Sequence, residues 1–135
     1  MYITLETDYA VRIVSYLADC NRRVDAKEIA EKICVTHRYV LKIARNLCTA
    51  GIIKSYKGAD GGYALAMSPS EITLLDILEA IEGPYKFSRC LNDPALCSRN
   101  MSGRCCFQCA FSEITDKVTE MLSQYTIENL HCKRK

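Results

Sequence analysis

The chain has 135 residues, of which 49% are hydrophobic and 25% charged, enough for one small domain with a buried core. No uninterrupted apolar run approaches the roughly 18 residues that span a bilayer, which argues against a membrane partner and favours a cytoplasmic location. The net charge of +2 does not by itself predict binding to nucleic acid. However, residues 1–58 carry ten Lys and Arg against six Asp and Glu, whereas the remaining residues carry eight against ten. The positive charge therefore gathers in the N-terminal part.

The N-terminal part is predicted to contain three helices. Between residues 7 and 20, apolar residues recur every three to four positions and make one apolar face. Asp25 begins a capping-box pattern and opens a second, short helix that ends near Cys34. Thr36 can cap a third helix, whose apolar stripe is followed by Gly51, a residue suited to a left-handed stop. The last two helices are therefore joined by only a few residues.

The third helix and the residues after it are basic. Residues 36–59 contain five Lys or Arg and no acidic residue, and two short helices joined by a tight turn are the layout of a helix-turn-helix. Such a basic helix can also be an ordinary solvated surface. Two strand-like runs at 52–56 and 63–67, joined by the glycine-rich residues 57–62, predict a β-hairpin directly after this helix. A basic hairpin in this place is typical of a wing, which favours DNA binding.

Five of the nine cysteines lie within residues 90–109, a stretch rich in turn-forming residues. Cys90, Cys97, Cys106 and Cys109 are spaced C-x6-C-x8-C-x2-C, which lets a flexible loop wrap around a compact centre. Thiolates are suitable ligands for iron-sulfur clusters and for zinc. Disulfides are disfavoured because the number of cysteines is odd and no signal peptide opens the chain. Spacing alone leaves open an iron-sulfur cluster, a zinc site and a set of redox-active thiols.

These features together resemble the Rrf2 family of regulators, which includes IscR, NsrR and RirA. The wing residues 58–63 read G-A-D-G-G-Y and fit a family pattern G-x-x-G-G-Y. The next helix opens with a capping box from Thr73 to Asp76 and ends at Gly83. The resemblance covers essentially the whole chain. It implies a mainly α fold with a small β-hairpin wing, a winged helix-turn-helix, a long C-terminal dimerisation helix and an iron-sulfur cluster in a three-cysteine loop.

The family resemblance also implies which cysteines hold the cluster. Cys90 and Cys97 match the first two family cysteines. Either Cys105 or Cys106 can be the third, and Cys106 is favoured because the residues after it align with a family pattern C-x-x-H-A. The cluster is expected to be either [2Fe-2S] or [4Fe-4S], with zinc as the alternative metal.

The fourth ligand has two candidates. Cys109 stands where IscR-like members carry a ligand His, and Asp8 stands where NsrR-like members carry an Asp that reaches the partner subunit's cluster. A fourth thiolate next to the third ligand is chemically sufficient, so Cys109 is expected ahead of Asp8. A carboxylate near the start of a helix also stabilises the helix dipole, which explains Asp8 without any metal.

The predicted organisation has three parts. Residues 1–83 form the winged helix-turn-helix DNA-binding domain, 84–109 the cysteine-rich cluster-binding loop, and 110–135 the dimerisation helix with a basic tail. Apolar positions from Ile114 to Tyr125 recur at helical spacing, and this stripe is expected to pack against a second copy of the chain. The residues predicted to face DNA are Thr36, Arg38, Tyr39, Lys42, Lys57, Gly61 and Gly62.

The sequence therefore predicts a dimeric repressor that binds a pseudo-palindromic, double-stranded operator. Its affinity for that operator is expected to depend on an iron-sulfur cluster that senses iron, redox or nitric oxide status. The alternative is a zinc- or iron-sulfur-stabilised protein that binds another protein or transfers electrons. No nucleophile and base are placed as in an enzyme, since His37 begins the third helix and His131 lies in the tail.

Two further expectations concern packing. Cys20, Cys34 and Cys48 are predicted to be small, buried hydrophobic residues without chemistry. Phe107 and Phe111 are expected to pack the cysteine loop against the helices and keep water from the cluster.

Overall fold

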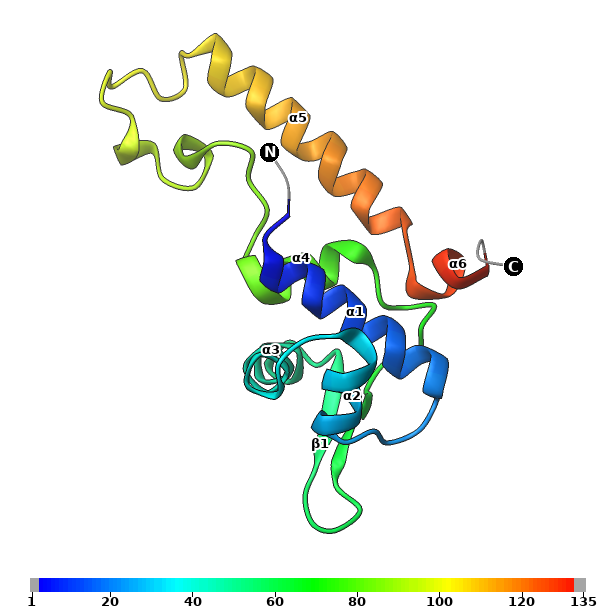
Figure 1. The fold of residues 1–135 in the computed structure, drawn as a ribbon. Coiled ribbons are helices and arrows are strands. Elements are labelled where there is room, and N and C mark those ends of the chain that lie inside the picture. Colours follow the sequence, from blue (N-terminus) through cyan, green and yellow to red (C-terminus); the bar gives the residue numbers. More distant parts are fainter. Residues whose placement is uncertain (1–2, 133–135) are drawn as a thin grey trace.

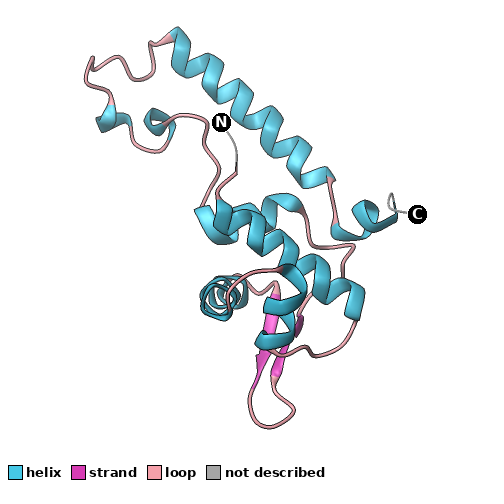
Figure 2. Cartoon of the chain, viewed as in Figure 1, coloured by secondary structure: helices cyan, strands magenta, loops and turns pink. Residues whose placement is uncertain are grey.

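The computed structural model describes residues 3–132, which form a mainly helical fold with one β-hairpin (Figures 1 and 2). The two strands are antiparallel, with Ile53 opposite Leu65 and Tyr56 opposite Gly62. This architecture confirms the predicted fold class. The elements in chain order are α1 (Leu5–Cys20), α2 (Ala26–Ile33), α3 (His37–Thr49), β1 (Ile53–Tyr56), β2 (Gly62–Leu65), α4 (Leu74–Glu82), the short 3-10 turns Arg89–Leu91 and Pro94–Leu96, α5 (Cys106–Gln124) and α6 (Ile127–Cys132).

The first four helices each begin at a polar residue whose side-chain oxygen accepts a hydrogen bond from a backbone N–H three residues later. These N-cap residues are Thr4, Asp25, Thr36 and Thr73. At the start of α4 the capping box is complete, because the Asp76 carboxylate also accepts from the backbone N–H of Thr73 at 2.9 Å. Gly51, with φ of +77°, ends α3 as predicted. The caps predicted from the sequence at Asp25, Thr36 and Thr73 are confirmed.

The core lies between α1, α2, α3, α4 and the hairpin. Its largest fully buried side chains come from all of these elements and include Ile13, Leu17, Ile29, Ile43, Leu47, Ile53 and Ile77. α2 and α3 are joined by three residues and both pack on α1, which is the helix-turn-helix arrangement expected from the sequence. None of the helices between residues 3 and 132 combines the length and apolar character that crossing a bilayer requires.

The hairpin is attached to the helices through the turn between α1 and α2. Val24 and Tyr63 exchange two backbone hydrogen bonds, of 2.9 and 2.8 Å, so this turn extends the sheet by one bridge. A Cβ atom on Gly62 would lie 2.5 Å from the Val24 carbonyl oxygen, and one on Gly61 would lie 2.6 Å from that of Tyr56. Both glycines are therefore required by packing inside the protein. The sequence analysis had placed both glycines among the residues that face DNA, a role that stays a prediction.

The long helix begins earlier than predicted. α5 starts at Cys106, four residues before the expected boundary at Ala110, and Cys105 is its N-cap residue. Cys106 and Cys109 therefore lie on the first turn of a helix and not in an irregular loop. In Figure 1, α5 runs along one side of the molecule, from the cysteine-rich segment toward α6.

The C-terminal residues form a helix that returns to the winged domain, which the sequence analysis missed. Ile127 is 2% exposed and donates its backbone N–H to the Ile72 carbonyl oxygen at 2.9 Å. His131 lies 2.9 Å from the Ser15 hydroxyl and 3.1 Å from the Asp19 carboxylate, so it joins α6 to α1. The predicted basic tail, residues 133–135, lies outside the described residues.

Candidate functional site

The outer face of α3 is the first candidate site. Thr36, Arg38, Tyr39 and Lys42, all predicted from the sequence to face DNA, are exposed and line one groove. The groove is completed by two residues that the prediction left out. These are Leu41 and Arg45. Leu41 was overlooked because leucine on a helix suggests core packing, although its position beside the buried stripe places it on the exposed face.

Helix α1 supports two of these groove residues from behind. The Lys42 amine pairs with the Glu6 carboxylate, whose hydrogen bond and charge raise the pKa of Lys42. The Tyr39 ring packs edge-on against Tyr9, with ring centroids 5.9 Å apart. Because the Lys42 side chain is 58% exposed, its ion pair contributes little to stability and can be replaced by a phosphate contact.

The wing presents its tip to solvent. Lys57 and Asp60 are both exposed there, whereas Gly61 and Gly62 are partly covered by the packing described above. At the base of the wing, the Arg23 guanidinium lies 3.7 Å from the centroid of the Tyr56 ring, a cation–π contact that holds a second basic residue beside the hairpin. The wing lies at the opposite end of the molecule from the cysteine-rich segment (Figure 1).

The cysteine-rich segment is the second candidate site, and it is open to solvent. In residues 79–126, all of which the structure describes, Thr115 is the only buried residue. The eight cysteines with described side chains are free thiols. Within the described chain, no three His, Cys, Asp or Glu side chains converge closely enough to hold a metal ion. The donor set nevertheless fits a cluster or zinc chemically, because the four predicted thiols are unpaired, unburied and confined to twenty residues.

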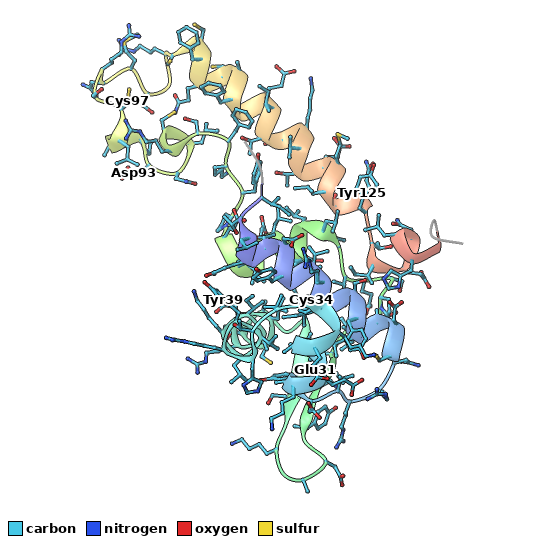
Figure 3. The ribbon with its side chains drawn as sticks, viewed as in Figure 1. Glu31, Cys34, Tyr39, Asp93, Cys97 and Tyr125 are labelled. Atoms are coloured by element: carbon cyan, nitrogen blue, oxygen red, sulfur yellow. The ribbon has the colours of Figure 1, made fainter. Side chains whose placement is uncertain are left out.

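Cys97 has the environment of a readily ionised thiol. Its sulfur accepts a hydrogen bond from the backbone N–H of Met101 at 3.5 Å, and backbone N–H groups of Met101 and Arg99 lower its pKa. Figure 3 shows Cys97 and Asp93 in the segment at the far end from Tyr39. A lowered pKa increases the thiolate fraction, and the thiolate is the form that binds metals.

The geometry of α5 bears on whether Cys105 or Cys106 is the third ligand. Cys106 is exposed and lies one helical turn from Cys109, so the two thiols share a face of α5. Cys105 is half-buried before the helix, and its carbonyl oxygen accepts the Cys109 backbone N–H at 3.1 Å. This arrangement favours the pair Cys106 and Cys109, and their role as ligands remains a prediction.

Asp8 already has a partner on its own helix. Its carboxylate lies 2.7 Å from the Arg12 guanidinium, one turn further along α1. This ion pair and the position near the helix start account for Asp8 in a single copy of the chain. Its alternative role as a ligand to a partner's centre stays a prediction.

The expectations for the other cysteines hold in part. Cys20 and Cys48 pack against the core, and burial raises the pKa of the Cys48 thiol. Cys34 differs, because it is exposed at the left-handed end of α2, with φ of +58°. The prediction of burial was wrong there because this residue faces outward in the turn between α2 and α3.

One aromatic contact fastens the cysteine-rich segment to α5. The rings of Phe87 and Phe111 stack with centroids 5.5 Å apart, and the Phe87 backbone N–H donates to the Thr115 hydroxyl at 3.0 Å. The packing role predicted for Phe111 is confirmed. Phe107 is 63% exposed, so its predicted packing is wrong in this single chain.

Another face of α5 carries an exposed apolar row. Phe107, Ile114 and Met121 are seven residues apart and are 63%, 39% and 57% exposed. A seven-residue repeat keeps apolar side chains on one line of a helix, as in helices that pack along a partner helix. The row is therefore a candidate surface for the predicted dimer.

The sequence of residues 3–133 matches the Rrf2 family, described as an iron-dependent transcriptional regulator. CymR of Bacillus subtilis, an HTH-type transcriptional regulator, is 30% identical over 132 residues, which cover 96% of this chain and 89% of CymR. NsrR of Shouchella clausii, also an HTH-type transcriptional regulator, is 27% identical over 133 residues, which cover 96% of this chain and 88% of NsrR.

Solved structures share the fold. That of CymR, described as the global cysteine regulator of B. subtilis, superposes with a TM-score of 0.74 at 30% identity and covers 96% of this chain and 95% of its own. IscR of T. potens superposes with a TM-score of 0.75 at 24% identity and covers 100% and 89%, a likeness that concerns the fold alone. The family match and the similarity to CymR both extend over nearly the whole chain. The chain therefore belongs to the Rrf2 family of transcriptional regulators.

Proposed function

We propose that this protein is a homodimeric repressor in the cytoplasm, without enzymatic activity, whose affinity for operator DNA is controlled by an iron-sulfur cluster. The observation that carries the proposal is the combination of two surfaces in one chain. One is the basic groove on α3, and the other is the exposed segment with four free thiols. A sensor and a DNA-reading surface are the two parts that such a regulator requires.

The DNA-binding half of the proposal assigns different roles to the groove and the wing. α3 enters the major groove, where Arg38 can pair with both acceptors of a guanine and so contribute to base selection. Lys42 and Lys57 contact phosphates, which adds affinity without sequence preference. Gly61 and Gly62 let the backbone of the wing pack closely, because a side chain at either position would clash with nearby backbone atoms. The wing in this shape brings Lys57 to the DNA backbone. Two copies joined along α5 place two α3 helices about 34 Å apart, on successive turns of a pseudo-palindromic operator.

The sensor half assigns Cys90, Cys97, Cys106 and Cys109 as cluster ligands, with Cys105 and the partner's Asp8 as the alternatives. A bound cluster supplies sensitivity to iron supply, oxidants and nitric oxide. The segment connects the end of α4 to the start of α5, so an ordered segment fixes the winged domain relative to the dimer axis. Because that placement sets the distance between the two α3 helices, cluster loss changes operator affinity.

An anaerobic preparation tests the proposal directly. Purified protein is expected to be coloured, to contain iron and sulfide in equal amounts, and to shift a DNA fragment from its own promoter in a gel. Removing the cluster with a chelator should change that shift. Protein that contains iron but binds no DNA would contradict the regulator and favour an electron-transfer or protein-interaction role.

A second candidate is a regulator of the same operator-binding type without an iron-sulfur cluster. One observation favours it: the relative CymR is described as a cysteine regulator. In this case the thiols bind zinc or respond directly to redox change. Colourless protein that still shifts the promoter fragment, with zinc or no metal bound, would establish this candidate in place of the first.

A further inference from the structure

One side chain ties together the separate parts of the cysteine-rich segment. The Gln108 side-chain oxygen accepts the backbone N–H of Gly103 at 2.9 Å. Its amide nitrogen donates to the Cys90 carbonyl oxygen at 3.2 Å and to the Ser102 hydroxyl at 3.5 Å. Gln108 is half-buried, although the segment around it is exposed. All donor and acceptor groups of this amide therefore face the segment.

The position of Gln108 on α5 explains this reach. It is the third residue of the helix, between Cys106 and Cys109, where a glutamine commonly bonds back to the backbone of the residue before the helix. Here it reaches two residues beyond the N-cap, to Gly103, and also across to Cys90. The side chain thus joins the two ends of the stretch from Cys90 to the helix turn.

One and two turns further along the same face of α5, two residues contact Phe87, which precedes this stretch. Phe111 stacks on Phe87, and Thr115 accepts the Phe87 backbone N–H. Gln108, Phe111 and Thr115 are spaced i, i+3, i+7, so they form one line of contacts. Phe111 and Thr115 hold the start of the segment through Phe87. Of the three residues, only Gln108 bonds to a residue with a candidate ligand thiol, Cys90.

We propose that Gln108 is the positioning residue of the metal centre, a role that rests on the proposed function. Its hydrogen bonds close the segment before any metal binds and hold the backbone of Cys90 beside the helix turn that carries Cys106 and Cys109. Cys97 is held separately, by its own turn with Met101. Because the segment lacks buried residues of its own, this closure lowers the conformational entropy lost when the thiols gather around a metal. Hydrogen-bonding partners outside the ligand set commonly change metal affinity about 10-fold to 100-fold.

Three variants of the full chain separate positioning from other roles. Gln108→Ala removes all three bonds. Gln108→Glu keeps the size and the acceptor for the Gly103 N–H, but it loses the amide donor to the Cys90 carbonyl. Gln124→Ala is the matched control, because Gln124 is an exposed glutamine at the other end of α5. Thermal unfolding should be the same for all, since Gln108 lies outside the buried core.

The first readout uses metal-free protein. Hydrogen exchange at the Gly103 amide and in the segment around Cys90 should become faster in Gln108→Ala and stay unchanged in Gln124→Ala. Gln108→Glu should protect Gly103 but not the segment around Cys90. Unchanged exchange in Gln108→Ala would overturn the closure.

The second readout is the affinity for Co²⁺, which absorbs visible light when thiolates bind it. Gln108→Ala should bind Co²⁺ about 10-fold to 100-fold more weakly than the wild type, and Gln108→Glu should be weakened as well. Equal affinity in Gln108→Ala and Gln124→Ala would overturn the role of Gln108 while leaving the centre in place. Wild-type protein without any cobalt–thiolate absorption would instead overturn the proposed centre itself, and the positioning role with it.

Discussion

The winged domain and the cysteine-rich segment are built by different means. In the winged domain, four capped helices and a hairpin surround a core of fully buried aliphatic side chains. Residues 84–105 have no buried residue, and their order comes from two short 3-10 turns and from hydrogen bonds to α5. The hydrophobic effect therefore specifies the first region, whereas the second depends on a few polar contacts and on the stacking of Phe87 on Phe111.

This difference suits a sensor. A region with little buried surface opens at low free-energy cost, so a ligand with modest binding energy can change its conformation. The adjoining winged domain has a buried core of its own, so its shape should depend little on the conformation of the segment. Gly83 and Pro84, the predicted boundary between the regions, lie directly after α4. Changes in one region should therefore have small effects on the folding of the other.

Core truncation should give the largest contrast between the regions. Ile43 is fully buried in α3, and Ile43→Ala is expected to lower the free energy of unfolding by about 2 to 5 kcal/mol through lost burial and a residual cavity. Leu96 in the segment is 47% exposed, and Leu96→Ala should cost about 0.5 kcal/mol or less. Urea unfolding measures both. A large loss for Leu96→Ala would mean that the segment contributes to a shared core.

Ligand substitutions should act on DNA affinity while sparing the fold. Replacing Cys90, Cys97, Cys106 or Cys109 singly by Ser is expected to reduce the cluster content and to change operator affinity by about 5-fold to 150-fold. Cys105→Ser is the matched control and should do neither. Iron analysis and gel shifts on the same preparations provide the measurements. Should Cys105→Ser abolish the cluster while Cys106→Ser spares it, the third ligand is misassigned.

Substitutions on the DNA-binding surfaces should distinguish the groove from the wing. Arg38→Ala is expected to reduce discrimination between the operator and unrelated DNA by about 1 to 3 kcal/mol, because a bidentate contact to guanine is lost. Lys57→Ala should weaken binding to both DNAs alike and reduce the salt dependence. Binding titrations at several salt concentrations measure these effects. If neither variant changes binding, α3 and the wing are not the DNA-contacting surfaces.

The sequence predicted the winged domain well because its signals are local. Caps at Asp25, Thr36 and Thr73 and the glycine-rich hairpin all concern neighbouring residues, and each matches the structure. The return of α6 to the core was missed, because the burial of Ile127 depends on where α5 ends in space and not on a local pattern.

In the candidate sites, cysteine spacing identified the segment but could not place its residues. The helix start at Cys106 lacks a polar N-cap side chain, so the sequence carried no signal for it. The hydrogen bonds of Gln108 span up to 18 residues and have no sequence pattern of their own. For Leu41 the sequence signal was misleading, because a leucine on a helix suggests a buried position in the core.

Leu41 should make a smaller, apolar contribution to base recognition. It is 42% exposed on the groove face among basic residues, where it can contact the methyl group of a thymine. Deoxyuridine lacks the methyl group of thymine, so the operator thymines can be replaced by it one at a time. At the one position that Leu41 contacts, the replacement should weaken wild-type binding about 4-fold, which corresponds to the loss of one buried methyl group. Leu41→Ala should be insensitive to that same replacement. Equal sensitivity of the variant and the wild type would show that Leu41 does not read this base.

The smallest expected effect on stability concerns Glu82, the last residue of α4. Partial desolvation of its carboxylate raises its pKa, but hydrogen bonds from Thr7 and Thr4 at the start of α1 outweigh this and lower the pKa below its ordinary value of 4.5. A carboxyl group with a lowered pKa in the folded state stabilises the fold above its unfolded pKa, and this stabilisation is lost as the pH falls through the folded value. Glu82→Gln should therefore lower Tm at pH 7 and have a smaller effect at pH 3. Glu79→Gln changes an exposed residue of the same helix and should have little effect at either pH. The difference should be small because Glu82 is exposed and its charge is screened by solvent. Thermal unfolding at both pH values measures it, and an equal loss at pH 7 and pH 3 would mean that the shape of the side chain matters here and its charge does not.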